Sequence, residues 1–76
     1  MWKEITPETK IELNTKVKLN SSNDMLIVKK QYDNKFELWR IDSSGKVLST
    51  PETLGVNFVA DKNELIRNYK VFEEIN

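Results

Sequence analysis

The stretch MLIVKKQYDNKFELWRI, residues 25–41, holds two apolar runs of β-favouring side chains on either side of a short polar segment. This arrangement predicts a β-hairpin. Asp33, Asn34 and Lys35 form the turn, in which asparagine tolerates the left-handed backbone conformation that a tight hairpin requires. We place this hairpin at the centre of the fold.

The predicted hairpin is apolar on both faces, because successive side chains of a strand point to opposite sides. One set of apolar residues consists of Leu26, Val28, Phe36 and Leu38, on the face that also carries Arg40, and the other consists of Met25, Ile27, Trp39 and Ile41. The two sets cannot share one core face. We expect the N-terminal segment or a second protomer to cover the second set.

The aromatic residues are expected mainly in the core, because a domain this small has few other large side chains to bury. Phe58 and Phe72 are assigned to the core. Trp39 is assigned there first, and contact with a partner or ligand is the alternative, because tryptophan is enriched at the centres of interfaces.

The segments next to the hairpin alternate in the same way. Ile11, Leu13, Val17 and Leu19 alternate with polar residues and predict a half-buried strand, continuous or broken near residues 14–15. Residues 20–24 (NSSND) are turn formers and predict a loop. Residues 42–45 (DSSG) predict a type I turn that closes on a left-handed glycine, followed by a short antiparallel strand over residues 46–49.

The remaining segments predict one helical turn region between strands. In order, we expect a loop at residues 50–55, a strand at 56–60, helical turns at 61–67 and a last strand at 69–75. Asp61 and Glu64 have the spacing of a capping box. Residues 1–10 form a lead-in segment with a single turn at Pro7, and Trp2 and Ile5 are expected to fold back onto the barrel.

These elements predict one all-β, or mainly β, domain over residues 1–76, a small barrel of five to six antiparallel strands. The short helical turn from Asp61 to Arg67, placed after a meander and before the last strand, resembles the SH3-like barrels. The opening Trp2, Ile5-Thr6-Pro7 and Thr9, followed by the strand KVKL at residues 16–19, is similar to small proteins of phages and mobile elements. The acidic loop residues and aromatic pair of SH3 domains that bind proline-rich peptides are not identified.

Composition argues against several classes of function. Lysine plus arginine and aspartate plus glutamate both number 12, so the net charge is zero and suggests no general affinity for nucleic acid. The chain has no cysteine and no histidine, and we expect no catalytic residues, no metal site and no cofactor. No apolar run is long enough to cross a bilayer and the N-terminus lacks a signal pattern, so we expect a cytoplasmic protein without a membrane partner.

One candidate binding surface remains, a basic stripe with aromatic neighbours. Its members are Lys16, Lys18, Lys29, Lys30, Lys35 and Arg40, with Tyr32 and Trp39. Cations beside stacking aromatics suit single-stranded nucleic acid. Alternatively, the lysines mark a solvated face and protect edge strands, and Glu12, Asp33 and Glu37 partly neutralise them.

We expect a non-enzymatic binding or accessory module. Its first expected partner is a protein, and a nucleic-acid-binding barrel that uses the basic face is the alternative. A homodimer is also considered.

Overall fold

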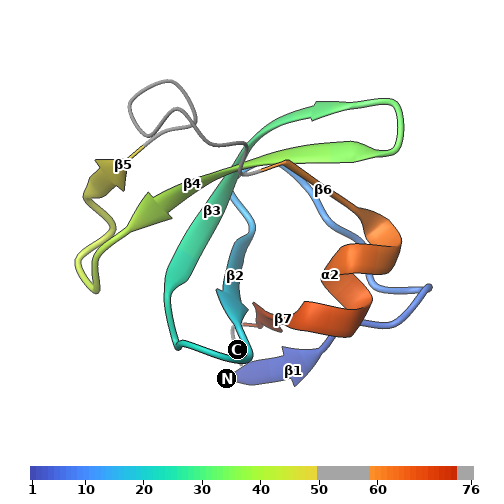
Figure 1. Ribbon diagram of the computed structural model, residues 1–76, viewed down its shortest axis with the longest axis horizontal. Coiled ribbons are helices and arrows are strands. Elements are labelled where there is room, and N and C mark those ends of the chain that lie inside the picture. The colour runs from blue at the N-terminus through green and yellow to red at the C-terminus, as the bar shows by residue number, and fades with distance from the viewer. Residues whose placement is uncertain (50–58, 74–76) are drawn as a thin grey trace.

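The computed structural model describes residues 1–49 and 59–73 of the 76-residue chain (Figure 1). The elements, in order, are β1 (Trp2–Glu4), β2 (Lys16–Leu19), β3 (Met25–Tyr32), β4 (Lys35–Ile41), β5 (Val47–Ser49), β6 (Val59–Asp61), α2 (Lys62–Asn68) and β7 (Tyr69–Phe72). All strand pairs are antiparallel, in the order β1-β7-β2-β3-β4-β5, and β6 pairs with β4.

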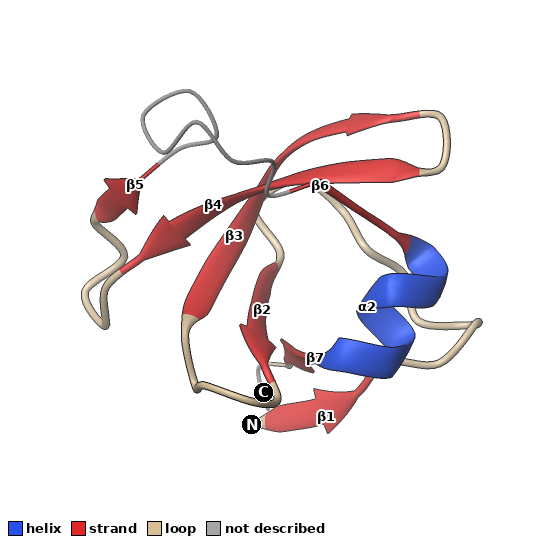
Figure 2. Cartoon of the chain, in the orientation of Figure 1, coloured by secondary structure: helices blue, strands red, loops and turns tan. Residues whose placement is uncertain are grey.

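The predicted all-β class with one short helix is confirmed (Figure 2). The sheet curls around the core, but within the described residues its ladder does not close into a complete barrel. Residues 1–49 and 59–73 contain seven strands, against the five to six predicted for the chain. The lead-in segment accounts for part of the difference, because its first residues form β1 and pair with β7.

The predicted hairpin is confirmed as β3 and β4, the longest strands of the sheet. β4 is central because β3 runs along one side, while β5 and β6 share the other side. In the turn, Asp33 has the positive φ, 53°, rather than Asn34 as expected. Aspartate also tolerates this conformation, since its short polar side chain bonds locally.

The core takes one of the two predicted apolar sets of the hairpin. Leu26, Val28, Phe36 and Leu38 belong to a single buried cluster with Ile5, Ile11, Val17, Ala60, Leu65, Tyr69 and Val71. Ile5 is only 3% exposed, so the lead-in segment does pack on the domain as predicted. The Lys62 ammonium also donates a hydrogen bond to the carbonyl of Thr9, which ties this segment to α2.

Two expectations about strands and core were wrong. The strand predicted from Ile11 to Leu19 is confirmed only in its second half, as β2. Residues 10–15 form no strand, because Asn14 adopts a left-handed conformation with φ 71° and donates its N–H to the carbonyl of Val28. Leu13 is consequently 56% exposed. Phe72 is 39% exposed and lies outside the core, since Tyr69 and Val71 take the inward positions of β7.

Trp39 is also outside the core cluster, so its first assignment was wrong. The indole is partly buried on the opposite side of β4 from Leu38. Phe58, the loop expected at residues 50–55 and most of the strand expected at 56–60 lie outside the described residues.

The predicted cap and turn are confirmed. Oδ1 of Asp61 accepts a hydrogen bond from the backbone N–H of Glu64 at 2.8 Å, and α2 begins at Lys62, directly after Asp61. The N–H of Gly45 donates to the carbonyl of Asp42 at 3.0 Å, and Gly45 has φ 92°. An L-amino acid rarely adopts that angle, so glycine is required there.

Candidate binding face on the outside of the sheet

The side of the sheet turned away from the core, here called the outer face, collects aromatic residues and lysines. Directly paired residues lie on the same side of a sheet, so the strand register defines this face. The members that the register gives are Trp2, Glu4, Lys16, Lys18, Met25, Ile27, Lys30, Tyr32, Lys35, Glu37, Trp39, Ile41, Val47, Val59, Asp61, Lys70 and Phe72. Lys29 joins them because its ammonium lies over the Trp39 ring. The set Met25, Ile27, Trp39 and Ile41 is therefore separated from the core set, as expected from the alternation. Ile41 is nevertheless buried, at 3% exposed, although it lies outside the core cluster.

A first aromatic pair is formed by Trp2 and Phe72 from the paired strands β1 and β7. The ring centroids are 5.2 Å apart and the rings are inclined by 71°, an edge-to-face arrangement. The Nζ atom of Lys18 lies 4.8 Å from the centre of the Trp2 ring. At this distance the ammonium is attracted to the electron-rich face of the indole.

A shallow hollow of about 320 Å³ adjoins this pair, lined by Trp2, Lys16, Met25, Ser43 and Phe72. Ser43 enters from the β4–β5 turn, which Asp42 holds in place. Its Oδ1 accepts hydrogen bonds from the Ser44 hydroxyl at 2.6 Å and from the backbone N–H groups of Ser44 and Lys46 at 2.9 and 3.0 Å. These bonds, led by that of the Ser44 hydroxyl, lower the pKa of Asp42.

The second aromatic site is Trp39, whose indole is held by groups on β3 and β4. Its Nε1 donates a hydrogen bond to Oε1 of Glu37 at 3.4 Å. The other oxygen of Glu37 lies 3.8 Å from Nζ of Lys30, and Glu37 itself is only 6% exposed. The Nζ atom of Lys29 lies 6.0 Å from the centre of the Trp39 ring and also donates to Oδ1 of Asn14 at 3.5 Å.

A β-bulge determines which side chains of β3 reach the outer face. Val28 pairs with Leu38 and Lys30 pairs with Glu37, so Lys29 is the extra residue. The bulge changes the alternation, and Lys30 and Tyr32 consequently lie on the same face as Ile27. An unbroken strand would have turned Lys30 and Tyr32 toward the core side.

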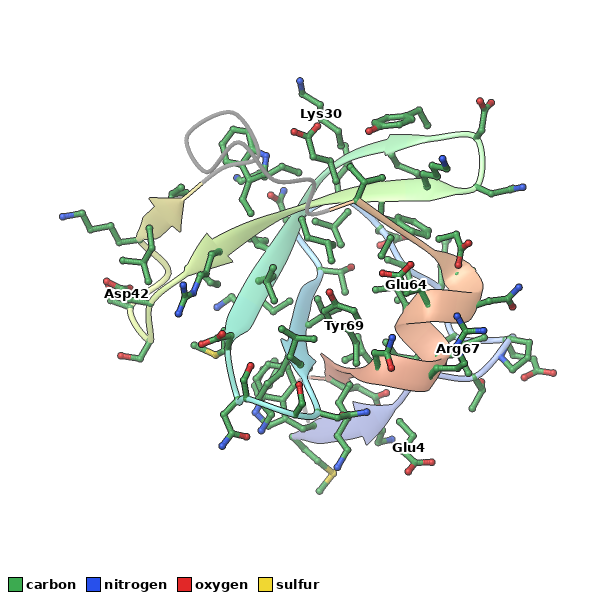
Figure 3. The ribbon with its side chains drawn as sticks, in the orientation of Figure 1. Glu4, Lys30, Asp42, Glu64, Arg67 and Tyr69 are labelled. Carbon is green, nitrogen blue, oxygen red and sulfur yellow. The ribbon has the colours of Figure 1, made fainter. Side chains whose placement is uncertain are left out.

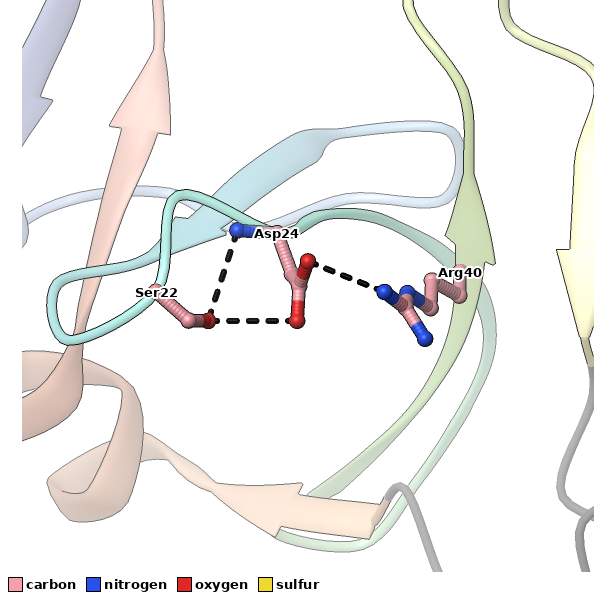
Figure 4. A network of polar contacts seen from close by, with 3 residues as sticks. All are labelled: Ser22, Asp24 and Arg40. Carbon is pink, nitrogen blue, oxygen red and sulfur yellow. Dashed lines mark hydrogen bonds and ion pairs between the residues drawn. The ribbon is translucent and has the colours of Figure 1, made fainter.

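Arg40 does not belong to the outer face. It pairs with the core residue Leu26, and its Nη2 donates to Oδ1 of Asp24 at 3.0 Å (Figure 4). The hydroxyl of Ser22 donates to the other oxygen of Asp24 at 3.2 Å. This network occupies the guanidinium at the rim of the core side. Seven of the eight residues predicted for this surface are therefore brought to one face, namely Lys16, Lys18, Lys29, Lys30, Lys35, Tyr32 and Trp39.

The outer face is more basic than the chain as a whole. It carries six lysines, Lys16, Lys18, Lys29, Lys30, Lys35 and Lys70, and three acidic residues, Glu4, Glu37 and Asp61. Of the acidic residues expected to neutralise the stripe, Glu12 instead pairs with Lys10 in the loop before β2. The face therefore has an excess of positive charge although the net charge of the chain is zero.

The prediction from sequence missed Trp2, Phe72 and Lys70 as members of this face. Alternation along β7 already turned Lys70 and Phe72 to one side. Nothing local, however, indicated that β1 would pair with β7 and bring Trp2 beside Phe72. In Figure 3, Tyr69 of β7 points into the interior and Glu4 of β1 points away from it.

Other kinds of site are not found in residues 1–49 and 59–73. No group of three or more carboxylate, imidazole or thiol side chains could hold a metal ion there. No helix in this described part is long and apolar enough to cross a membrane. The chain matches no protein-family model, no curated protein and no solved structure.

Proposed function

We propose that this protein is a non-enzymatic binding module that holds single-stranded nucleic acid on the outer face of its sheet. The observation that carries the proposal is the pairing of each tryptophan with a lysine ammonium, Lys18 with Trp2 and Lys29 with Trp39. Proteins that bind single strands combine such elements, since bases stack on aromatic rings and lysines neutralise phosphates.

The position of the cations favours this ligand over a purely apolar partner. A protein contact of ordinary strength buries a continuous apolar centre with few charges. Here Lys16 pairs directly with Ile27, and Lys18 pairs with Met25, so positive charges lie among the apolar side chains. A polyanion with flat, stackable bases complements this mixture.

The test is a titration of a fluorescein-labelled eight-nucleotide thymidine strand with the purified protein, followed by anisotropy at 50 and 200 mM salt. We expect binding at 50 mM salt that weakens at 200 mM. Each phosphate contact contributes about −0.7 to the slope of log K against log salt for a single strand. No change in anisotropy at low salt would overturn the proposal.

A matched pair of variants shows where the strand binds. The double variant Lys16→Gln, Lys18→Gln should bind more weakly and reduce the salt slope by about 1.4, for two lost contacts. Lys10→Gln is the control, because Lys10 pairs with Glu12 outside the outer face, and it should bind like the wild type. Heparin carries negative charge without bases, so it should not quench tryptophan fluorescence as the oligonucleotide does.

A protein partner is the second candidate, and edge strand β5 favours it. Val47 is 39% exposed and Leu48 is 56% exposed, at the end of the described ladder. A strand of another protein can add to such an edge. Affinity capture from the host after nuclease treatment, followed by mass spectrometry, tests this candidate. The same partner should be lost from the variant Leu48→Lys, and retention of all captured proteins by that variant would exclude the β5 edge.

A further inference from the structure

Trp2 and Trp39 are two separate aromatic sites on the outer face. Trp2 is on β1 and Trp39 is on β4, and the sheet order between them is β1-β7-β2-β3-β4. Neighbouring strands are about 4.8 Å apart, so the four steps amount to roughly 19 Å along the sheet. No single base can contact both rings.

The residues between the two tryptophans continue the same mixed character. Trp2 is opposite Phe72, Lys16 is opposite Ile27, and Ile27 is opposite Trp39. Lys16 also lines the hollow beside Trp2 and Phe72, which joins the two halves of the row. A ligand that follows this row therefore meets an aromatic site, a cation, an apolar side chain and a second aromatic site.

We infer, on the basis of the proposed function, that one nucleic-acid strand crosses the sheet and stacks a separate base on each tryptophan. At a stacked spacing of about 3.4 Å per nucleotide, roughly six nucleotides cover the distance. The ligand class is thus an unpaired segment of about six nucleotides or more. A strand of three nucleotides, about 10 Å long at this spacing, engages only one site.

Two stacking sites joined by one strand raise affinity differently from a single site that only gains more phosphate contacts. Once the first base is bound, the second binds intramolecularly at a high effective concentration, which raises affinity by on the order of 100-fold or more. Wild-type protein should therefore bind an eight-nucleotide thymidine strand about 100-fold more tightly than a three-nucleotide strand. A smooth increase that follows only the number of phosphates would contradict the inference.

The decisive ligands are two eight-nucleotide strands with the same number of phosphates and four thymines each. In the first strand, two thymines lie at each end and the four central positions are abasic. In the second, the four thymines are central and the ends are abasic. The first strand should bind at least ten-fold more tightly. Equal affinities, within a factor of two, would overturn the two-site inference and leave the proposed function standing.

Single-tryptophan variants report each site separately, because the chain has two tryptophans. Trp39→Phe leaves Trp2 as the reporter, and Trp2→Phe leaves Trp39, while both keep an aromatic ring in place. The first strand, with thymines at its ends, should quench the fluorescence of both tryptophan reporters, with one strand bound per protein. A response from one reporter alone would also overturn the inference. If neither reporter responds and anisotropy shows no binding, the proposed function itself fails.

Discussion

Trp39 and Glu37 lie on the same side of β4, and the indole N–H of Trp39 donates a hydrogen bond to a carboxylate oxygen of Glu37 across 3.4 Å. Among the described residues, Glu37 is the one buried residue with a charged side chain. The carboxylate also faces the ammonium of Lys30, so it joins the indole to the basic residues of the outer face. The orientation of Trp39 thus depends on a neighbour two residues away.

Substitution of Glu37 separates these two contacts. Glu37→Gln keeps an acceptor for the indole and loses the ion pair, and because Lys30 is largely exposed we expect a change in unfolding free energy of less than about 1 kcal/mol. Glu37→Leu also leaves the indole N–H without this acceptor and should cost about 1 kcal/mol more. Urea unfolding measures both, and equal stability of the two variants would show that the hydrogen bond contributes nothing.

Leu38 and Leu13 allow the same chemical change to be compared in two environments. Leu38 is fully buried in the core cluster, so Leu38→Ala should cost about 2–5 kcal/mol. That loss is a large part of the stability of a small domain. Leu13 is 56% exposed, and Leu13→Ala should change stability by less than about 0.5 kcal/mol. Circular dichroism during thermal and urea unfolding gives the comparison, and a large effect at Leu13 would contradict its exposed position.

Asp61 caps the only helix of the described chain. Asp61→Ala removes the acceptor for the N–H of Glu64 and should reduce the free energy of unfolding by about 1 kcal/mol. Asp61→Asn keeps a side-chain acceptor and should lie within a few tenths of a kcal/mol of the wild type. The midpoints of urea unfolding decide between them. An alanine variant as stable as the asparagine variant would contradict the cap.

Tyr69 makes stability depend on alkaline pH. Burial raises the pKa of its hydroxyl above the usual value of 10.0, and the carboxylate of Glu64 raises it further. The folded state therefore holds this proton more tightly than the unfolded state, and its contribution to stability is complete below pH 10. It is lost as the pH rises from 10 through the raised pKa.

The measurement is urea unfolding between pH 8 and pH 11 for the wild type and for Tyr69→Phe. The phenylalanine variant should lose this part of the alkaline dependence. Tyr32→Phe is the matched control, and it should keep the wild-type dependence because Tyr69 remains in place. Identical pH profiles for the wild type and Tyr69→Phe would show that Tyr69 does not carry the effect.

Part of the candidate site was accessible to prediction from sequence alone. Alternation along residues 36–41 put Trp39 on the face opposite Leu38, and the lysines of residues 16–18 were correctly associated with it. Arg40 was wrongly included, since a count of basic residues does not show that Asp24 already holds its guanidinium. The grouping of Lys30 and Tyr32 with Trp39 depends on the bulge at Lys29, and no residue type there signals an extra position.

The sequence by itself determined the features that act over a few residues. These are the hairpin of residues 25–41, its two incompatible apolar sets, the glycine turn at Gly45 and the helix cap at Asp61, because turn sterics and local hydrogen bonds depend on immediate neighbours. Only the tertiary structure decided that β1 pairs with β7 and that Trp2 meets Phe72, 70 positions away. Contacts so distant in sequence form only when burial of the whole core offsets the entropy of closing the intervening chain, and no local pattern contains that balance.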